Sequence, residues 1–164
     1  MYYEYTLTTG SGVVSGRCWM QAGRIRTESV VGGEHVVSLF DGDSNTITVY
    51  RPDRNRAFRF ASEMDPRTAL AESGYSRAAS PADVESLGRV VCEGISCLLV
   101  AAQSVGSPER VRLWAREDRG LPVRMEISST SAGKTVMEYK NLQFGPVPEG
   151  IFDLPAGVEV EHVG

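Results

Sequence analysis

Few residues of this 164-residue chain have the types and spacing that catalysis requires. His35 and His162 lie far apart in the sequence, and neither is accompanied by a nearby acid and nucleophile. A histidine base must come within hydrogen-bond reach of the nucleophile that it activates. Three cysteines and two separated histidines also lack the spacing of a zinc site. We therefore expect a protein that is not an enzyme and that carries no metal or cofactor.

Two clusters of charged residues have both a chemical and a plainer interpretation. Asp41, Asp43 and Asn45 resemble part of a calcium loop, but the bidentate glutamate and the remaining spacing are missing. Turn formation explains them better. The run from Arg24 to Arg26, followed by Glu28, could bind an anion. Charges that alternate along a strand more often form a solvated face with cross-strand pairs, and we favour that interpretation.

Cys92 and Cys97 flank the segment Glu93 to Ser96, which has the composition of a turn. We predict that they face each other across a hairpin, close enough for a disulfide bond. A disulfide would indicate an oxidising compartment. Two half-buried free thiols are an equally good interpretation, and Cys18 has no partner in either.

Composition is that of one globular domain spanning residues 1–164. The net charge of −4 argues against a nucleic-acid-binding protein, which normally has a basic face. No apolar run approaches the ~20 residues that cross a bilayer. Strand-like sequence begins at Tyr2, so no signal peptide is visible. The chain is either cytosolic or a mature exported chain with an added methionine, and composition does not distinguish these.

Alternation of apolar and polar residues is the main structural signal of the chain. In the run from Arg110 to Arg116, for example, apolar side chains alternate with arginines, which is typical of an antiparallel sheet with two different faces. Similar runs separated by short turns predict about eleven strands. They cover residues 2–8, 13–21, 24–31, 34–40, 45–51, 56–60, 89–92, 97–102, 110–116, 123–127 and 137–140. So long an antiparallel meander normally curls into a complete or incomplete barrel.

Two short helices are predicted in the middle of the chain. Asp65-Pro66 and Ser80-Pro81 are helix start signals, and they predict helices over Thr68–Ser73 and Val84–Leu87. Helices this short need packing to persist. We expect them to cover the concave sheet face through Leu70, Val84 and Leu87. The predicted fold class is thus mainly β, an antiparallel unclosed β-barrel with short helices over its concave face.

The aromatic residues allow two interpretations. Trp114 shares its strand face with arginines, so it is either an anchor for a partner or an indole covered by arginine side chains, and we favour the second. Phe58 and Phe60 share one strand face, as do Val36 and Phe40. These four could line a ligand cavity or belong to an ordinary core, which is the default for apolar side chains.

Several segments resemble the LolA/LolB-like superfamily. They are "WMQAGRIRTE", "DGDSNTITVYRPDRNRAF", "VVCEGISC", "VRLWAREDRGLPVRMEI" and "MEYKNLQFGPVPEGIFDLPAGVEV", and together they cover most of the chain. The resemblance implies an unclosed barrel with helices as a lid and an apolar cavity, which in the carriers holds lipoprotein acyl chains in transit across the periplasm. This chain departs from the carriers at Gln21-Ala22-Gly23, where they have an arginine–proline pair, and in its shorter predicted lid helices.

The resemblance implies a periplasmic lipid- or lipoprotein-binding carrier. The alternative is a periplasmic sensory or protein-interaction module on the same fold. The implied partner is an apolar ligand such as a lipid or acyl chain, with a lipoprotein or membrane-associated protein as a further candidate, and no nucleic acid. Residues with the apolar parity of their strands, together with the helix residues, form the predicted ligand site: Phe40, Phe58, Phe60, Leu70, Val84, Leu87, Leu113 and Met125.

Overall fold

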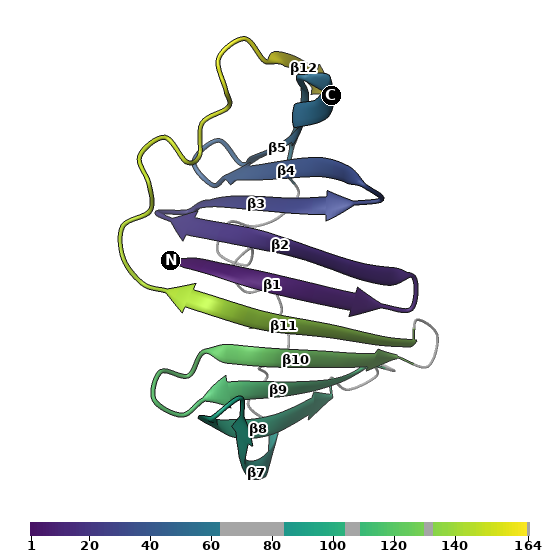
Figure 1. The fold of residues 1–164 in the computed structure, drawn as a ribbon, viewed down its shortest axis with the longest axis vertical. Coiled ribbons are helices and arrows are strands. Elements are labelled where there is room, and N and C mark those ends of the chain that lie inside the picture. Colours follow the sequence, from purple (N-terminus) through teal and green to yellow (C-terminus); the bar gives the residue numbers. More distant parts are fainter. Residues whose placement is uncertain (63–83, 104–108, 130–132, 164) are drawn as a thin grey trace. The chain divides into compact units, whose positions relative to one another are not determined.

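The computed structural model describes residues 1–62, 84–103, 109–129 and 133–163 (Figure 1). Most of this part of the chain is β-strand. The strands are β1 (Tyr2–Thr9), β2 (Gly12–Gln21), β3 (Arg24–Val31), β4 (Glu34–Asp41), β5 (Thr46–Arg51), β6 (Arg56–Ala61), β7 (Val84–Cys92), β8 (Ile95–Gln103), β9 (Arg110–Arg116), β10 (Pro122–Ser129), β11 (Gly133–Gln143) and β12 (Glu159–Val163). Within the described ranges the one helical element is a 3₁₀ turn, η1 (Pro52–Arg54).

The strands follow the order β12-β6-β5-β4-β3-β2-β1-β11-β10-β9-β8-β7, so the sheet does not close on itself. This confirms the predicted mainly antiparallel, unclosed architecture, with twelve strands in place of about eleven. Contacts divide the chain into two compact units. Unit 1 comprises residues 1–5, 14–69 and 141–164, and unit 2 comprises residues 6–13 and 70–140.

The additional strand, β12, lies at the C-terminal end of the chain and pairs with β6 in parallel, from Glu159 opposite Arg56 to Val163 opposite Phe60. Arg56 also forms an ion pair with Glu161, at 3.1 Å. The partner strand of β12 lies about a hundred residues earlier in the sequence. Local sequence patterns therefore do not predict this pairing.

Val84–Leu87 is not a helix. It forms the first part of β7, paired with β8 from Val84 opposite Ala102 onward. The register shifts between Ser86 and Gly88, and Gly88 has a φ of 106°, so Gly88 belongs to a β-bulge. Val84 and Leu87 are exposed, which also contradicts the covering role predicted for them. Strand pairing has overridden a weak local helix signal. The predicted helix at Thr68–Ser73, with Leu70, lies outside the described residues.

The hairpin between β7 and β8 turns through Glu93 and Gly94, which both have positive φ, as in a type I′ turn. Cys92 therefore pairs with Ile95, and Cys97 pairs with Val90. The two cysteines are diagonal neighbours on one face, so the prediction that they lie directly opposite each other is wrong. Both are free thiols, and burial, followed by the adjacent Cys92 thiol, raises the pKa of Cys97.

The polar face of unit 2 places Trp114 beside Arg124, because these residues are paired across β9 and β10. The Arg124 guanidinium lies 5.5 Å from the centre of the indole ring. Arg124 also forms ion pairs with Glu126 at 2.7 Å and Glu138 at 2.9 Å. The interpretation of Trp114 as an indole covered by an arginine is confirmed.

Gly16 in β2 offers a test of the packing of unit 1. A Cβ atom at this position would lie 2.5 Å from the Glu28 carbonyl oxygen and 2.6 Å from the ring of Tyr5. We expect Gly16→Ala to lower the free energy of unfolding by about 1–3 kcal/mol, as overpacking does. Chemical denaturation measures this change. Gly10→Ala is the control, because nothing lies within 4 Å of a Cβ there. Equal effects of the two substitutions would contradict the close approach at Gly16.

Candidate functional site

A row of apolar side chains crosses unit 1 from β2 to β12. Each member is the cross-strand partner of the next, and paired residues lie side by side on one face of a sheet. The row consists of Met20, Ile25, Phe40, Ile47, Phe60 and Val163. Phe58 is on the same face, two residues before Phe60, and the Arg56 guanidinium lies 5.6 Å from the centre of its ring. Three predicted ligand residues, Phe40, Phe58 and Phe60, therefore share one face of unit 1.

This apolar row is covered unevenly. Met20 and Phe40 are buried, whereas Phe60 is 37% exposed and Val163 at the edge strand is exposed as well. The apolar surface of the row is thus open at the end formed by β6 and β12. A ligand that covered this end would remove apolar surface from water, which is the main favourable term in such binding.

Unit 2 has an apolar row of its own. Val100, Leu113, Met125 and Met137 are successive partners across β8, β9, β10 and β11. Leu113 and Met125, both predicted ligand residues, therefore lie side by side, and Met125 is buried. Val84 and Leu87 belong to β7 at the end of this sheet. The predicted ligand residues thus fall into a set in each unit, and their joint role in one site stays a prediction.

The other face of unit 1 is covered by its own C-terminal segment, residues 144–158, which we call the C-terminal strap. Leu154 and Val158 of the strap pack against a core cluster of Val37, Leu39, Tyr50 and Ala57. These core residues alternate with Phe40, Val49 and Phe58 along their strands, so they occupy the opposite face from the apolar row. One face of the unit 1 sheet is therefore packed against the C-terminal strap. The other face carries the apolar row, whose end at β6 and β12 is exposed.

Arginines on β3 hold the middle of the C-terminal strap. Arg26 donates from Nη1 to the carbonyl oxygen of Ile151 at 2.9 Å and forms an ion pair with Glu28 at 2.7 Å. The Arg24 guanidinium lies 4.9 Å from the centre of the Phe152 ring. The predicted cross-strand pairing of the β3 charges is present between Glu28 and Arg17 of β2, which are paired residues. Arg26 pairs with Glu28 on its own strand, and Arg24 interacts with the strap.

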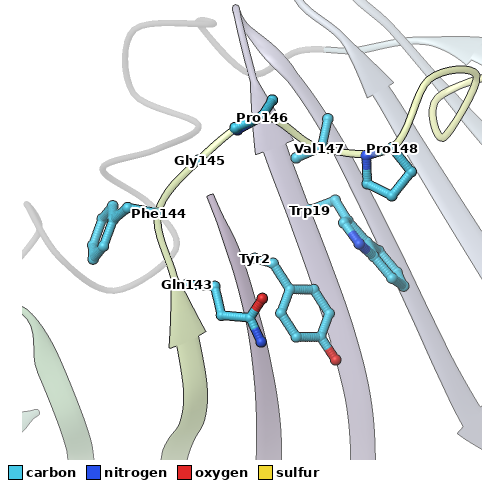
Figure 2. A pocket seen from close by; sticks show the side chains of 8 residues that line it. All are labelled: Tyr2, Trp19, Gln143, Phe144, Gly145, Pro146, Val147 and Pro148. Carbon is cyan, nitrogen blue, oxygen red and sulfur yellow. The ribbon is translucent and has the colours of Figure 1, made fainter.

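The first turn of the strap forms a groove of about 310 Å³ with the N-terminal strands of unit 1 (Figure 2). Its walls are Tyr2 and Trp19 on one side and the segment from Gln143 to Pro148 on the other. The rings of Tyr2 and Trp19 are 5.2 Å apart, and the Tyr2 hydroxyl donates to Glu4 at 2.8 Å. Partial burial and this hydrogen bond raise the pKa of Tyr2. We refer to this feature as the aromatic groove.

The aromatic groove was not predicted, although its sequence holds a usable signal. Gly145-Pro146-Val147-Pro148 cannot continue a regular strand, because proline lacks the backbone N–H that a sheet requires. The segment must therefore leave the sheet after β11. Which side chains it then crosses depends on contacts with Tyr2 and Trp19, more than a hundred residues away, and local patterns do not contain that information.

A second, more polar cleft of about 260 Å³ lies farther along the strap. Arg24, Asp41, Thr48 and Arg59 line it from the sheet, and Phe152 to Leu154 line it from the strap. Asp41 accepts hydrogen bonds from the backbone N–H groups of Asp43 at 2.9 Å and Ser44 at 3.4 Å. Asp41 therefore shapes the turn between β4 and β5, as the turn interpretation of this cluster predicts.

In the described part of the chain, no helix is long and apolar enough to cross a membrane.

Comparison with known proteins finds similarity in structure alone. No protein-family model matches the sequence, and no curated protein matches it. An uncharacterized conserved protein from Thermus thermophilus superposes with a TM-score of 0.65 at 13% identity, over 99% of this chain and 91% of that one. LppX, a lipoprotein of Mycobacterium tuberculosis, superposes with a TM-score of 0.53 at 14% identity, over 88% of both chains.

MucB of Pseudomonas aeruginosa, in a structure of its complex with MucA, gives a TM-score of 0.56 at 15% identity. The match covers 99% of this chain but 58% of that one, so this chain spans little more than half of the MucB length. At these identities the similarity shows the fold and nothing further. The fold is shared with MucB and LppX, and membership of a family is not shown.

Two arginines that share one glutamate test how the strap is held. Arg17 and Arg26 both pair with Glu28 at 2.7 Å, but the Arg17 side chain is 57% exposed and that of Arg26 13% exposed. We expect Arg26→Gln to cost about 2–4 kcal/mol of unfolding free energy, since it weakens a partly buried ion pair and the bond to Ile151. Arg17→Gln should cost about 1 kcal/mol or less.

Limited proteolysis of the strap reports the same difference locally. Arg26→Gln should accelerate cleavage within residues 144–158 relative to the unaltered protein, and Arg17→Gln should not. Cleavage at equal rates in the two variants would show that the Arg26 contact with Ile151 does not hold the strap in place.

Proposed function

We propose that the protein binds an apolar chain, such as a lipid or acyl group, on the apolar face of its sheet, and that it is not an enzyme. The observation that carries this proposal is the apolar row of unit 1, which continues from buried Met20 and Phe40 to exposed Phe60 and Val163. Exposed aromatic and aliphatic side chains in register with a buried apolar row provide a continuous surface for a flexible hydrocarbon chain.

The energetics of such binding are favourable. Each CH₂ group that leaves water contributes about 0.8 kcal/mol. A chain of several carbons laid along Phe60 and its neighbours would therefore offset a substantial part of the cost of association. Binding of this kind requires no directional polar contacts, in keeping with a row made only of apolar side chains.

The proposed location is the periplasm or an equivalent exported compartment. Support comes from the sequence resemblance to LolA/LolB-like proteins and from the shared fold of LppX, a lipoprotein. A lipid or a lipoprotein acyl chain is the ligand that this location would supply.

Protein interaction is the second candidate function, and the aromatic groove favours it. Tyrosine and tryptophan are enriched among the residues that dominate protein interfaces. Tyr2 and Trp19 line the groove, and Phe144 at its edge is exposed. The MucB structure with MucA is an example of a partner complex on a similar fold. In this chain a partner segment would occupy the aromatic groove, on the strap side of unit 1.

Phe60→Arg tests the first proposal. A charge at the exposed end of the apolar row must be desolvated when a hydrocarbon chain covers it. We expect the substitution to weaken binding of a fluorescent fatty-acid probe at least about tenfold, which is about 1.4 kcal/mol. Fluorescence titration measures the affinity, and far-UV circular dichroism checks that the β-structure is intact.

Val30→Arg is the matched control. Val30 is 44% exposed, compared with 37% for Phe60, and alternation along β3 places it on the face opposite Ile25. It should bind the probe like the unaltered protein. If the unaltered protein does not bind the probe, or if both variants lose binding equally, the lipid-binding proposal is wrong and the aromatic groove becomes the leading candidate.

A further inference from the structure

The polar cleft of unit 1 is built from two neighbouring rows of one sheet face. Arg24, Asp41 and Thr46 are successive cross-strand partners in one row, and Leu39, Thr48 and Arg59 form the next row on the same side. Phe152 to Leu154 of the C-terminal strap close the cleft. Except for Phe40, the strand residues that line the cleft belong to the face opposite the apolar row, so a role for it is separate from the proposed lipid binding.

Ion pairing of the arginines in unit 1 singles out two residues. Five of the seven arginines described in this unit form ion pairs with glutamates: Arg17 and Arg26 with Glu28, Arg51 and Arg54 with Glu34, and Arg56 with Glu161. The other two, Arg24 and Arg59, form no ion pair with any described residue, and both line the polar cleft. The described arginines of this unit that form no ion pair thus line the same cleft.

Among the described residues, each of these arginines is oriented by one contact that leaves other N–H groups available. Arg59 donates from Nε to Thr48 Oγ1 at 2.9 Å, and Thr48 is only 3% exposed, so this anchor is fixed. The terminal Nη1 and Nη2 nitrogens of Arg59 form no hydrogen bond with a described residue, so within this part of the chain they remain as donors. The Arg24 guanidinium lies over the Phe152 ring, a contact that uses its flat face and leaves its in-plane N–H groups free.

The acidic residues of the cleft do not neutralise both arginines. Asp41 accepts the two turn N–H groups described above. Partial burial would raise its pKa, but these bonds, the Ser44 side chain and the charge of Arg24 outweigh burial and lower the pKa. Asp153 is exposed at the rim. The carboxylates of Asp41 and Asp153 reduce the positive potential of the cleft. The cleft therefore suits a small ligand with one oxyanion group rather than a polyanion.

We infer that this cleft is a binding site for a small oxyanion, a carboxylate or a phosphate group, held by Arg59 and Arg24. Guanidinium groups match both ions with paired, charge-assisted hydrogen bonds. At about 260 Å³ the cleft is at or just below the small end of typical ligand sites, which indicates a small molecule or a single headgroup. The anion-site interpretation of the β3 arginines thus applies to Arg24, together with a distant partner on β6.

An NMR titration with inorganic phosphate, at constant ionic strength, tests this assignment. Saturable shifts of the Arg59 and Arg24 Nε–H signals are expected, with smaller shifts for arginines paired to glutamate. Arg59→Gln and Arg24→Gln should each weaken binding at least about tenfold, as loss of a charged partner does. Arg59→Lys keeps the charge but lacks the paired donors, and it should also weaken binding.

Arg56→Gln is the control, because it removes the same charge from the same strand outside the cleft. If it weakens phosphate binding as much as Arg59→Gln, the effect is general charge and the inference is overturned. It is also overturned if no Nε–H signal shifts in the folded, unaltered protein.

Dihexanoylphosphatidate is the second probe. Tighter binding than phosphate would assign the oxyanion to a lipid headgroup, and equal or weaker binding would assign it to a free metabolite.

Discussion

Strand register is the constraint on which the structure of unit 1 depends. Ile25 pairs with Phe40, and Phe40 pairs with Ile47. Because successive residues alternate between the two faces, these pairings fix the face of all remaining side chains in the three strands. A shift of one residue would put Leu39 and Tyr50 among the phenylalanines and leave the strap without its core. The apolar row, the packed face and the polar cleft are consequences of one pairing scheme.

The two faces of unit 1 solve different problems. On one, Leu154 and Val158 of the strap pack against the core cluster, so part of this face is covered by the chain itself. The strap crosses the face by short contacts with Arg26 and Arg24 and does not seal it, which is why a groove and a cleft border it. On the other face the apolar row continues to Phe60 and Val163, which are both exposed.

Sequence alone predicted the elements that repeat a local pattern and missed those that depend on distant contacts. Alternation predicted the strands from β1 to β6 and their short turns closely, as well as the shared face of Phe40, Phe58 and Phe60. It failed at Val84–Leu87, where a helix start signal of a few residues is outweighed by pairing with the long strand β8. It also missed β12 and the aromatic groove, whose residues meet partners about a hundred or more positions away. The two strands that carry Cys92 and Cys97 were predicted correctly. Their register was not, because it is set by the two-residue turn at Glu93-Gly94, which composition does not specify.

Placement on opposite faces also determines how the proposals relate to one another. An apolar chain on the row of Phe40 and Phe60 gains by leaving water, whereas an oxyanion at Arg24 and Arg59 gains by paired hydrogen bonds, so the two respond differently to salt and to chain length. Thr48, which orients Arg59, is the sequence neighbour of Ile47 in the apolar row, and their side chains lie on opposite faces of β5. A ligand that displaced β5 from one face would therefore also shift the side chains that form the site on the other face. Coupling of this kind requires a measurable change of one affinity by the other ligand, and it would be reciprocal.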